Sequence, residues 1–299
     1  MPSFPLCHTG IVSSRPAPSR RRSVLWSVVS VVILAALYAT VVGLYAGSGD
    51  VVASGEGETT GDTVALALTP EKMDATTNRF SMSVVPTQGD DGTVTNGLVA
   101  LRSFGVLISA VAGSKATPFE DGGVIAPIET SLVMDGEIEN WPFDRYTVRT
   151  VMTAIEEEAD GESVPLPTTV QPAKRGIPGW DIAVAETPLG GGILAVDITV
   201  TRSGSTIAFG IVLLTLMVII PILVVTVAVI VLRGKRKVEV TALGWMGAML
   251  FATIPLRNFL PGSPPIGSWI DYLIVLWVLA ALVAGLVLFV VAWVRRGPA

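Results

Sequence analysis

Carboxylates are the side chains in this sequence best suited to chemistry. Glu137, Glu139 and Asp144 fall close together in a stretch that also contains Asp135-Gly136, a typical turn pair. Two carboxylates can act as general acid and general base, as they do in glycoside hydrolysis. The same residues also satisfy the ordinary needs of a turn, where Asp accepts backbone N–H bonds. We therefore keep a carboxylate-based envelope enzyme as the weakest hypothesis and assign no catalytic residue.

Histidine and cysteine chemistry is confined to one place. The chain has one cysteine, Cys7, and one histidine, His8, and both precede the first apolar run. The long polar stretch that follows therefore has no thiol nucleophile, no histidine base and no His or Cys metal ligand. The acidic run Glu156-Glu157-Glu158 lacks the ordered alternation of a calcium loop. We expect no cofactor and no metal ion.

The most distinctive motif is Trp141-Pro142-Phe143-Asp144-Arg145-Tyr146. Proline forces the residue before it into an extended conformation. The two aromatic side chains at 141 and 143 can fill a core where a strand begins, while Asp144 accepts backbone N–H bonds. The motif predicts a structural corner that ends at Tyr146. A loop that contacts a partner or transmits a signal is the alternative.

A second motif runs from Pro255 to Asp271 and contains four prolines, of which Pro255 is the first. Proline fixes the backbone, so the segment is stiff. Arg257, followed by Asn258, flanks it on one side and Asp271 on the other. We predict a rigid turn closed by an Arg257–Asp271 ion pair. An ion or substrate mouth is the alternative, because ionisable groups at membrane depth are costly and often functional.

Four apolar runs surround these motifs, at residues 24–46, 206–232, 240–256 and 269–294. A helix needs about 20 apolar residues to cross the hydrocarbon core of a bilayer. Only 15% of the chain is charged, against about 25% in ordinary soluble domains. The sequence predicts a membrane protein with four transmembrane helices. A cleaved signal peptide is the alternative for 24–46, although that run exceeds the usual apolar length of such peptides.

Basic residues mark one side of the predicted bilayer. They cluster at Arg20-Arg21-Arg22, at Arg233 to Lys237 and at Arg295-Arg296. Lysine and arginine accumulate in cytoplasmic segments of membrane proteins. This predicts cytoplasmic segments at 1–23, 233–239 and 295–299, with both termini inside. Residues 47–205 and the proline-rich loop 257–268 are then extracytoplasmic, and the location is the plasma membrane of a bacterium.

Between the first two apolar runs the pattern is that of strands. Apolar residues alternate at Val64-x-Leu66-x-Leu68, at Phe80-x-Met82-x-Val84 and at Leu194-x-Val196-x-Ile198-x-Val200. Period two indicates strands with one buried face, and Gly-Asp turns separate them. Segment 47–61, rich in Gly, Ser, Thr and Asp, predicts a tether. The fold class is α + β, with an antiparallel β-sandwich inserted between helices 1 and 2.

Charge limits the partners. Residues 50–203 hold 23 Asp and Glu against nine Lys and Arg, a net charge of −14. Nucleic acid binding needs a basic face, so we expect no nucleic acid partner. The lipid bilayer is the expected partner, with an envelope protein or a second copy of the chain as further possibilities.

Two families share these motifs. The Trp-Pro-Phe-Asp corner resembles that of pentameric ligand-gated ion channels, which also join a β-sandwich to four helices. This chain departs from them because one helix precedes the sandwich and three follow it, and because residues 47–205 lack cysteine. Trp141-Pro142-Phe143-Asp144-x-Tyr146, with Arg257-Asn258, Pro261-Gly262 and Pro264-Pro265-x-Gly267-Ser268 ahead of Asp271, resembles a bacterial membrane family, the domain of unknown function 4436. That resemblance extends from about residue 65 onward and implies a multi-pass membrane protein without assigned chemistry.

Three functional hypotheses follow. The leading one is a plasma-membrane protein, not an enzyme, whose sandwich binds or scaffolds envelope components. The second is an oligomeric channel or transporter formed by helices 2–4. The third is the carboxylate enzyme described above.

Overall fold

The computed structural model describes residues 28, 32, 35, 36, 38–40, 42, 43, 51–54, 63–89, 92–109, 115–157, 163–174 and 176–296. The chain divides into two units, residues 1–43 and 44–299. The described positions between 28 and 43 are helical. The predicted tail 1–23 and most of the predicted apolar run 24–46 lie outside the described residues.

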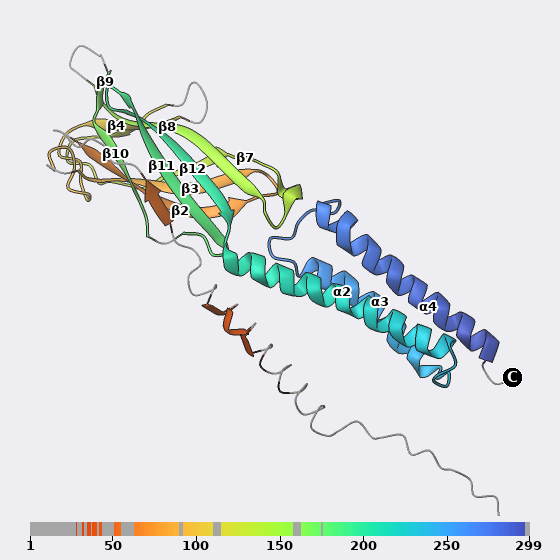
Figure 1. The fold of residues 1–299 in the computed structure, drawn as a ribbon. Coiled ribbons are helices and arrows are strands. Elements are labelled where there is room, and N and C mark those ends of the chain that lie inside the picture. The colour runs from red at the N-terminus through yellow and green to blue at the C-terminus, as the bar shows by residue number, and fades with distance from the viewer. Residues whose placement is uncertain are drawn as a thin grey trace, which may run out of the picture. The chain divides into compact units, whose positions relative to one another are not determined.

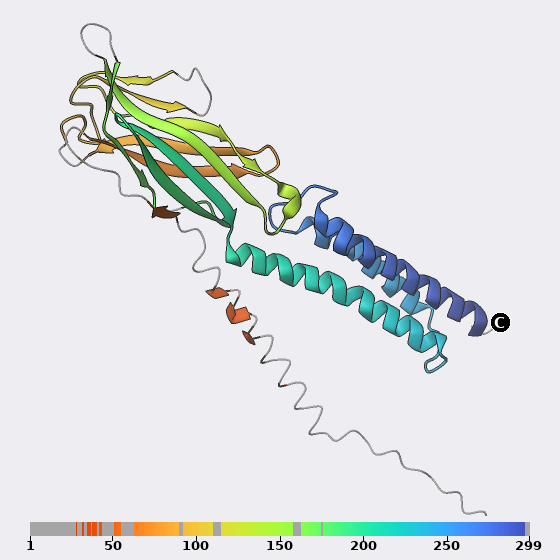
Figure 2. The ribbon, with the colours of Figure 1, turned by 45° about the horizontal axis from the view of Figure 1, so that its top comes forward.

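Two sheets form the β domain, which we define as residues 51–202. The larger sheet has the order β1 (Val51–Ser54), β11 (Trp180–Gly190), β12 (Ile193–Arg202), β8 (Arg145–Glu157), β4 (Phe104–Ser109) and β5 (Thr117–Phe119), while β7 (Asp135–Gly136) and β9 (Ser163–Leu166) also pair with β8. The smaller sheet has the order β10 (Thr168–Pro172), β2 (Val64–Asp74), β3 (Arg79–Gln88) and β6 (Ile128–Val133). Figures 1 and 2 show the two sheets as layers.

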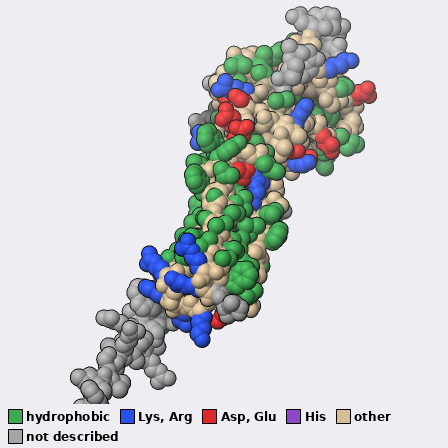
Figure 3. Space-filling view, turned by 90° about the vertical axis from the view of Figure 1, so that its right-hand side faces the viewer, with side chains coloured by type: hydrophobic (Ala, Val, Ile, Leu, Met, Phe, Trp, Pro, Cys, Tyr) green, Lys and Arg blue, Asp and Glu red, His purple; other side chains and the backbone are tan. Residues whose placement is uncertain are grey.

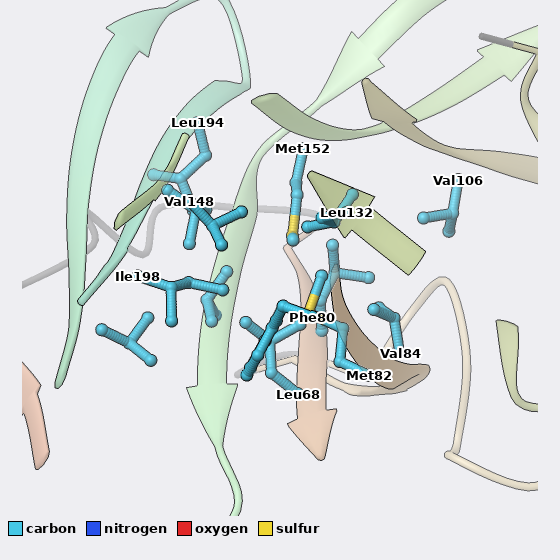
Figure 4. Close-up of a cluster of buried hydrophobic side chains, with 14 of the residues drawn as sticks. Leu68, Phe80, Met82, Val84, Val106, Leu132, Val148, Met152, Leu194 and Ile198 are labelled. Atoms are coloured by element: carbon cyan, nitrogen blue, oxygen red, sulfur yellow. The ribbon is translucent and has the colours of Figure 1, made fainter. Parts of the chain in front are cut away.

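The core of the β domain lies between the sheets in a sandwich-like arrangement. Phe80 and Met82 of β3 face Met152 of β8 and Ile198 of β12 (Figure 4), and all four side chains are fully buried. Alternation puts every second side chain on this inner face. The predicted inward faces of 64–68, 80–84 and 194–200 are confirmed, because their apolar members are buried.

The sheets differ from the prediction in two respects. Two pairings are parallel, β1 with β11 and β10 with β2, so the arrangement is not purely antiparallel. The segment 47–61, predicted as a tether, contains strand β1. This strand has only four residues and a mostly exposed side-chain pattern, so it shows no alternation against a core. Its backbone pairing to β11, which the sequence does not reveal, holds it in place.

The chain enters and leaves the β domain at the same end. Val51 at the start of β1 pairs with Ile182, only two residues from Trp180, and Trp180 pairs with Arg202 at the end of β12. Ser203 then caps the first helix that follows, with its hydroxyl accepting a bond from the Thr206 backbone N–H. The two ends of the β domain therefore lie close together.

Three helical segments follow the β domain. They are α2 (Gly204–Leu232), α3 (Thr241–Asn258) and α4 (Leu276–Arg296), which is preceded by a π-helical turn, η2 (Asp271–Val275). They pack side by side (Figure 1), with Met217 and Met246 fully buried and a shared apolar cluster that includes Val224, Leu282 and Phe289. Pro221 lies inside α2. The predicted runs 206–232 and 240–256 thus correspond to α2 and α3, and the run 269–294 corresponds to η2 together with α4.

Two of the helical segments, Gly204–Leu232 and Asp271–Arg296, are long and apolar enough to cross a membrane. Many of their large apolar side chains are exposed, including Phe209, Ile222, Leu273 and Trp277. The segment α3 has 18 residues, about 27 Å at the rise of an α-helix.

A candidate functional site at the junction of sheet and helices

Residues of the two sequence motifs meet where the β domain joins the helices. Three elements contribute to this junction. The corner between the short 3-10 helix η1 (Ile138–Asn140) and β8 supplies residues 141–146, the end of β12 supplies Arg202, and the loop between α3 and η2 supplies residues 259–270. Backbone pairing of β8 with β12, down to Arg145 opposite Thr201, brings the corner beside Arg202.

Asp144 and Arg202 form a buried ion pair at the centre of the junction. Arg202 Nε donates to Asp144 Oδ1 at 2.6 Å and Nη2 donates to Oδ2 at 2.9 Å. Their side chains are 0% and 1% exposed. The Tyr146 hydroxyl donates to Asp144 Oδ2 at 3.0 Å. The carboxylate therefore accepts three bonds, which compensates the loss of water around a buried charge.

Aromatic rings enclose this ion pair. The Arg202 guanidinium lies 4.5 Å from the centroid of the Trp180 ring, within the range of a cation–π interaction. Tyr146 meets Trp180 edge to face, with 5.8 Å between centroids. Burial, reinforced by the charge of Asp144, raises the pKa of Tyr146 above its ordinary value. Its hydroxyl therefore stays protonated and continues to donate to the carboxylate.

The backbone carbonyl of Pro261 fastens the helical loop to the β domain. It accepts one bond from Trp141 Nε1 at 2.8 Å and another from Arg202 Nη1 at 3.2 Å. The indole of Trp141 packs with Leu260 and Ile270, and with Leu213 and Leu214 of α2. A glycine, Gly210, faces the ring, and an added Cβ there would come within 2.8 Å of it. The corner is thus inserted between α2 and the loop.

The predicted Arg257–Asp271 ion pair is present and closes that loop. Arg257 Nε donates to Asp271 Oδ1 at 3.1 Å, and Nη2 donates to Oδ2 at 2.8 Å. The guanidinium also donates to the carbonyls of Pro264 at 2.9 Å and Pro265 at 3.0 Å. Asp271 accepts a further bond from the Gly267 backbone N–H. Four bonds from one arginine therefore define the shape of the proline-rich turn.

Grooves lie beside η2 on the helices. One of about 300 Å³ is lined by Arg257, Asn258 and Asp271 at its polar end and by apolar residues of α3 and α4. Asn258 is exposed there. A second groove of about 460 Å³ lies between α2 and α4 beside Pro221, and Thr226 is its one hydroxyl-bearing lining residue. Both are mostly apolar, as sites for lipid or helix contacts are.

Several predicted roles were wrong in detail. Trp141 is buried but packs against the helices instead of the β core, and Phe143 is 73% exposed. Asp144 accepts bonds from two side chains, not from the backbone N–H groups expected of a corner. The reason is that η1 ends at the corner and turns the motif toward the helices. Pro142 and Tyr146 are buried as members of the same corner.

Sequence reasoning missed Arg202, Trp180 and the Pro261 carbonyl. One signal for Arg202 was present, because it is the last charged residue before a long apolar run. An arginine next to an apolar helix is expected to pair with a carboxylate, because an unpaired buried charge is costly. The backbone carbonyl carries no residue-type signal at all.

In the described residues, no hydrogen bond connects any two of the three carboxylates of the enzyme hypothesis. Glu137 is exposed and accepts a bond from Asn140 Nδ2 at 2.9 Å, Glu139 is also exposed, and Asp144 is occupied by Arg202. Among the described residues, no group of three or more His, Cys, Asp and Glu side chains could hold a metal ion. The junction joins the β domain to the helical segments through a buried ion pair and two hydrogen bonds to the Pro261 carbonyl.

Comparison with known families follows the same division of the chain. A family model described as a domain of unknown function (DUF4436) matches residues 54–201. Residues 54–201 belong to the DUF4436 family. A second domain of unknown function (DUF8686) matches residues 202–296. The DUF4436 resemblance expected from the sequence is confirmed for the Trp-Pro-Phe-Asp corner, whereas the Arg257 to Asp271 motif lies in the DUF8686 range. No curated protein matches the chain.

Proposed function

We propose that this chain is an integral protein of a bacterial plasma membrane whose β domain is a binding platform, or scaffold, for other envelope components. The observation that carries the proposal is the junction. A buried ion pair and two bonds to the Pro261 carbonyl attach the DUF4436 domain to helices whose outer surface is apolar. Such an attachment holds a domain at a fixed height and orientation above a membrane.

The surface of the helices supports a bilayer setting. Figure 3 shows hydrophobic side chains along the helices and Lys and Arg gathered at the end away from the β domain. Exposed aromatic residues occur near both ends: Phe259, Trp269 and Tyr272 near the junction, and Trp245 and Trp293 near the basic end. Tyr272 and Trp293 are about 31 Å apart along the helix, close to the thickness of the hydrocarbon core. Aromatic belts of this kind mark membrane interfaces.

The proposed topology has four crossings. The run 24–46 crosses outward, the β domain lies outside, and α2, α3 and α4 cross in turn, so that both termini are cytoplasmic. Two observations support it. The two chain connections of the β domain lie at one end, as an insertion between two crossings requires. The basic residues of the α2–α3 loop lie with those at the end of α4, which suits a single cytoplasmic face.

The β domain offers a place for a protein partner. Leu98 and Val124 are 75% and 77% exposed, and Leu101 is also exposed. The segments that carry Leu98 and Val124 are neighbours, because Val99 forms a bridge with Val124 and the Ile125 backbone N–H donates to the Leu98 carbonyl at 2.9 Å. Exposed aliphatic side chains on an acidic domain are the features that a partner surface would cover.

Site-specific photo-crosslinking tests this role in living cells. A photoreactive amino acid at Leu98 or Val124 should capture the same envelope protein, because the two residues lie on neighbouring backbone segments. The matched control is Arg149, which is exposed on β8 and should capture nothing in common with them. Absence of any cross-linked protein at both positions would contradict a binding platform on this surface.

An oligomeric channel or transporter formed by α2, α3 and α4 is the second candidate, and the groove between α2 and α4 is the observation in its favour. The hydroxyl groups of Thr215, Thr226 and Thr253, however, each donate to the carbonyl four residues earlier in their own helix. They therefore contribute little to a polar pathway. Flux of a fluorescent or radioactive solute into vesicles that contain the protein would favour this candidate.

A further inference from the structure

The end of the helices opposite the β domain carries a cluster of positive charge, which we call the basic collar: Arg233, Lys235, Arg236, Lys237, Arg295 and Arg296. The first four follow α2 directly. The helix ends in a Schellman motif, in which the Lys235 backbone N–H donates to the Ile230 carbonyl at 3.2 Å and the Gly234 N–H donates to the Val231 carbonyl at 2.9 Å. Gly234 has φ +72°, a conformation that favours glycine.

The last two members come from the far end of the sequence. Arg296 Nη1 donates to the Val231 carbonyl at 3.3 Å, which ties the end of α4 to the end of α2. A side chain at position 234 would meet the Arg296 guanidinium, which would have to shift, so the requirement for glycine at this position comes mainly from φ. The fold, and not the local sequence alone, therefore assembles the collar (Figure 3).

The charge of the collar is left unpaired within the described part of the chain. All six side chains belong to exposed residues, and none forms an ion pair with a described carboxylate. Glu239 is the one acidic residue in the α2–α3 loop. The C-termini of α2 and α4 each contribute roughly half a negative charge. These offset only part of the formal charge of six cations.

The surroundings of the collar select its ligand. Two exposed tryptophans lie near it: Trp293 on α4 is two residues before Arg295, and Trp245 lies in the second turn of α3. The helix surface beyond them is apolar. A ligand must therefore be anionic and must sit at the boundary between water and hydrocarbon. Arginine forks pair with phosphate oxygens bidentately, and lysine binds phosphate as a point charge.

We infer that the basic collar is a binding site for the headgroups of phospholipids with net negative charge. The inference rests on the proposed membrane placement of the helices. A basic residue near an anionic membrane surface contributes about 1 kcal/mol, which corresponds to about a fivefold factor in binding. Replacing four of the six cations should therefore weaken binding by at least about tenfold. Zwitterionic lipid gains little from the collar because its headgroup has no net charge.

Native mass spectrometry of the full chain in a neutral detergent tests this site. The probes are dioleoylphosphatidylglycerol and dioleoylphosphatidylcholine, titrated separately. The variant replaces Arg233, Lys235, Arg236 and Lys237 with Gln. Its matched control replaces Lys72, Arg79, Lys115 and Lys174, four exposed cations of the β domain, with Gln. Binding of phosphatidylglycerol should weaken at least about tenfold in the collar variant and stay unchanged in the control.

Other outcomes overturn the inference. Equal binding of both lipids by the natural chain, or an equal loss in both variants, would show that the collar does not select anionic headgroups. Displacement of phosphatidylglycerol by millimolar inorganic phosphate would show a site for free phosphate instead. Should the quadruple variant not fold, Lys235→Gln with Lys237→Gln must weaken phosphatidylglycerol binding in the same direction. The titration does not depend on the direction in which the helices cross a membrane, so its failure leaves the topology to a separate test.

Discussion

At the scale of single residues, the junction depends on charges that water cannot reach. A buried ion pair stabilises a protein only when additional bonds replace the lost hydration. Asp144 meets this requirement with Arg202 and Tyr146, and Arg202 meets it with the Pro261 carbonyl and the Trp180 ring. Removing one partner leaves the other as an uncompensated buried charge.

We expect Asp144→Ala to lower the free energy of unfolding by about 3–5 kcal/mol, since that is the usual effect of breaking a buried ion pair. Thermal unfolding of the full chain in detergent measures it. The matched control is the exposed pair of Arg149 and Asp197, whose side chains are 87% and 52% exposed. Asp197→Ala should change the stability by less than about 1 kcal/mol. Similar effects of the two substitutions would contradict the central role of Asp144.

The pH dependence of stability should contain an opposing contribution from Glu186. Burial raises the pKa of this carboxyl, although the Val170 backbone N–H partly counteracts it. Within the window between the ordinary pKa and the raised one, the folded state binds more protons, so stability falls as pH rises. Glu186→Gln removes this loss. Its melting temperature should exceed that of the natural chain at about pH 7 and approach it at about pH 4.

Asp74 provides a comparison with the opposite sign. Hydrogen bonds from the backbone, first that of Thr77 and also that of Thr76, lower its pKa. Its contribution to stability is present above the ordinary pKa and is lost as pH falls through that range. Asp74→Asn should therefore reduce the melting temperature at neutral pH and make less difference in acid. If Glu186→Gln followed this same profile, burial would not be raising the pKa of Glu186.

At the scale of secondary-structure elements, the corner packs against α2 because Gly210 has no side chain and leaves room for the Trp141 ring. Gly210 faces the Trp141 ring, whereas Gly244 and Gly247 of α3 have open space where a Cβ would lie. Gly210→Ala should force the ring to move and should cost about 1–3 kcal/mol of stability, as overpacking does. Gly247→Ala is the matched control and should not destabilise the chain. Thermal unfolding in detergent distinguishes the two.

The loop before η2 depends on the geometry of arginine and not only on its charge. Arg257 makes four bonds, two to Asp271 and two to the carbonyls of Pro264 and Pro265. Lysine has three donors on one nitrogen and cannot reproduce this fork. We expect Arg257→Lys to lower stability by about 1–3 kcal/mol, measured by detergent melting. Exchange of the two residues, Arg257→Asp with Asp271→Arg, should not restore it, because a carboxylate would then face two carbonyl oxygens. Full recovery would show that charge alone matters.

Some strands and ion pairs of the chain could be predicted from the sequence, and others could not. Alternation identified the inward faces of β2, β3 and β12, because those residues contact a continuous core. Strand β1 was missed, since its stability comes from backbone pairing and not from a buried face. The Arg257–Asp271 pair was predictable from two lone charges in an apolar region. The partner of Asp144 was not, because Arg202 lies 58 residues away and is brought to it by strand pairing.

At the scale of the whole molecule, the proposed topology can be tested with single cysteines in a Cys7→Ser background. Ile266 is 93% exposed in the loop between α3 and η2, and Lys235 is exposed at the other end of the helices. Ile266→Cys should react with an impermeant maleimide in intact cells, and Lys235→Cys should react only after the membrane is opened. Lys235 is preferable to Gly234, where a side chain meets Arg296. Labelling of position 235 from outside would reverse the orientation.

The boundary between the two family matches falls between Thr201 and Arg202. Asp144 and Trp141 therefore belong to one family domain, while Arg202 and Pro261 belong to the other. A descendant that kept the first domain and replaced the second would bury a carboxylate with no cation opposite it. Inheritance of the two domains is thus expected to be linked, and changes at positions 144 and 202 should appear together across related genomes. Positions such as Leu98 and Val124, which bind nothing across the boundary, are free to diverge with each lineage's own partners.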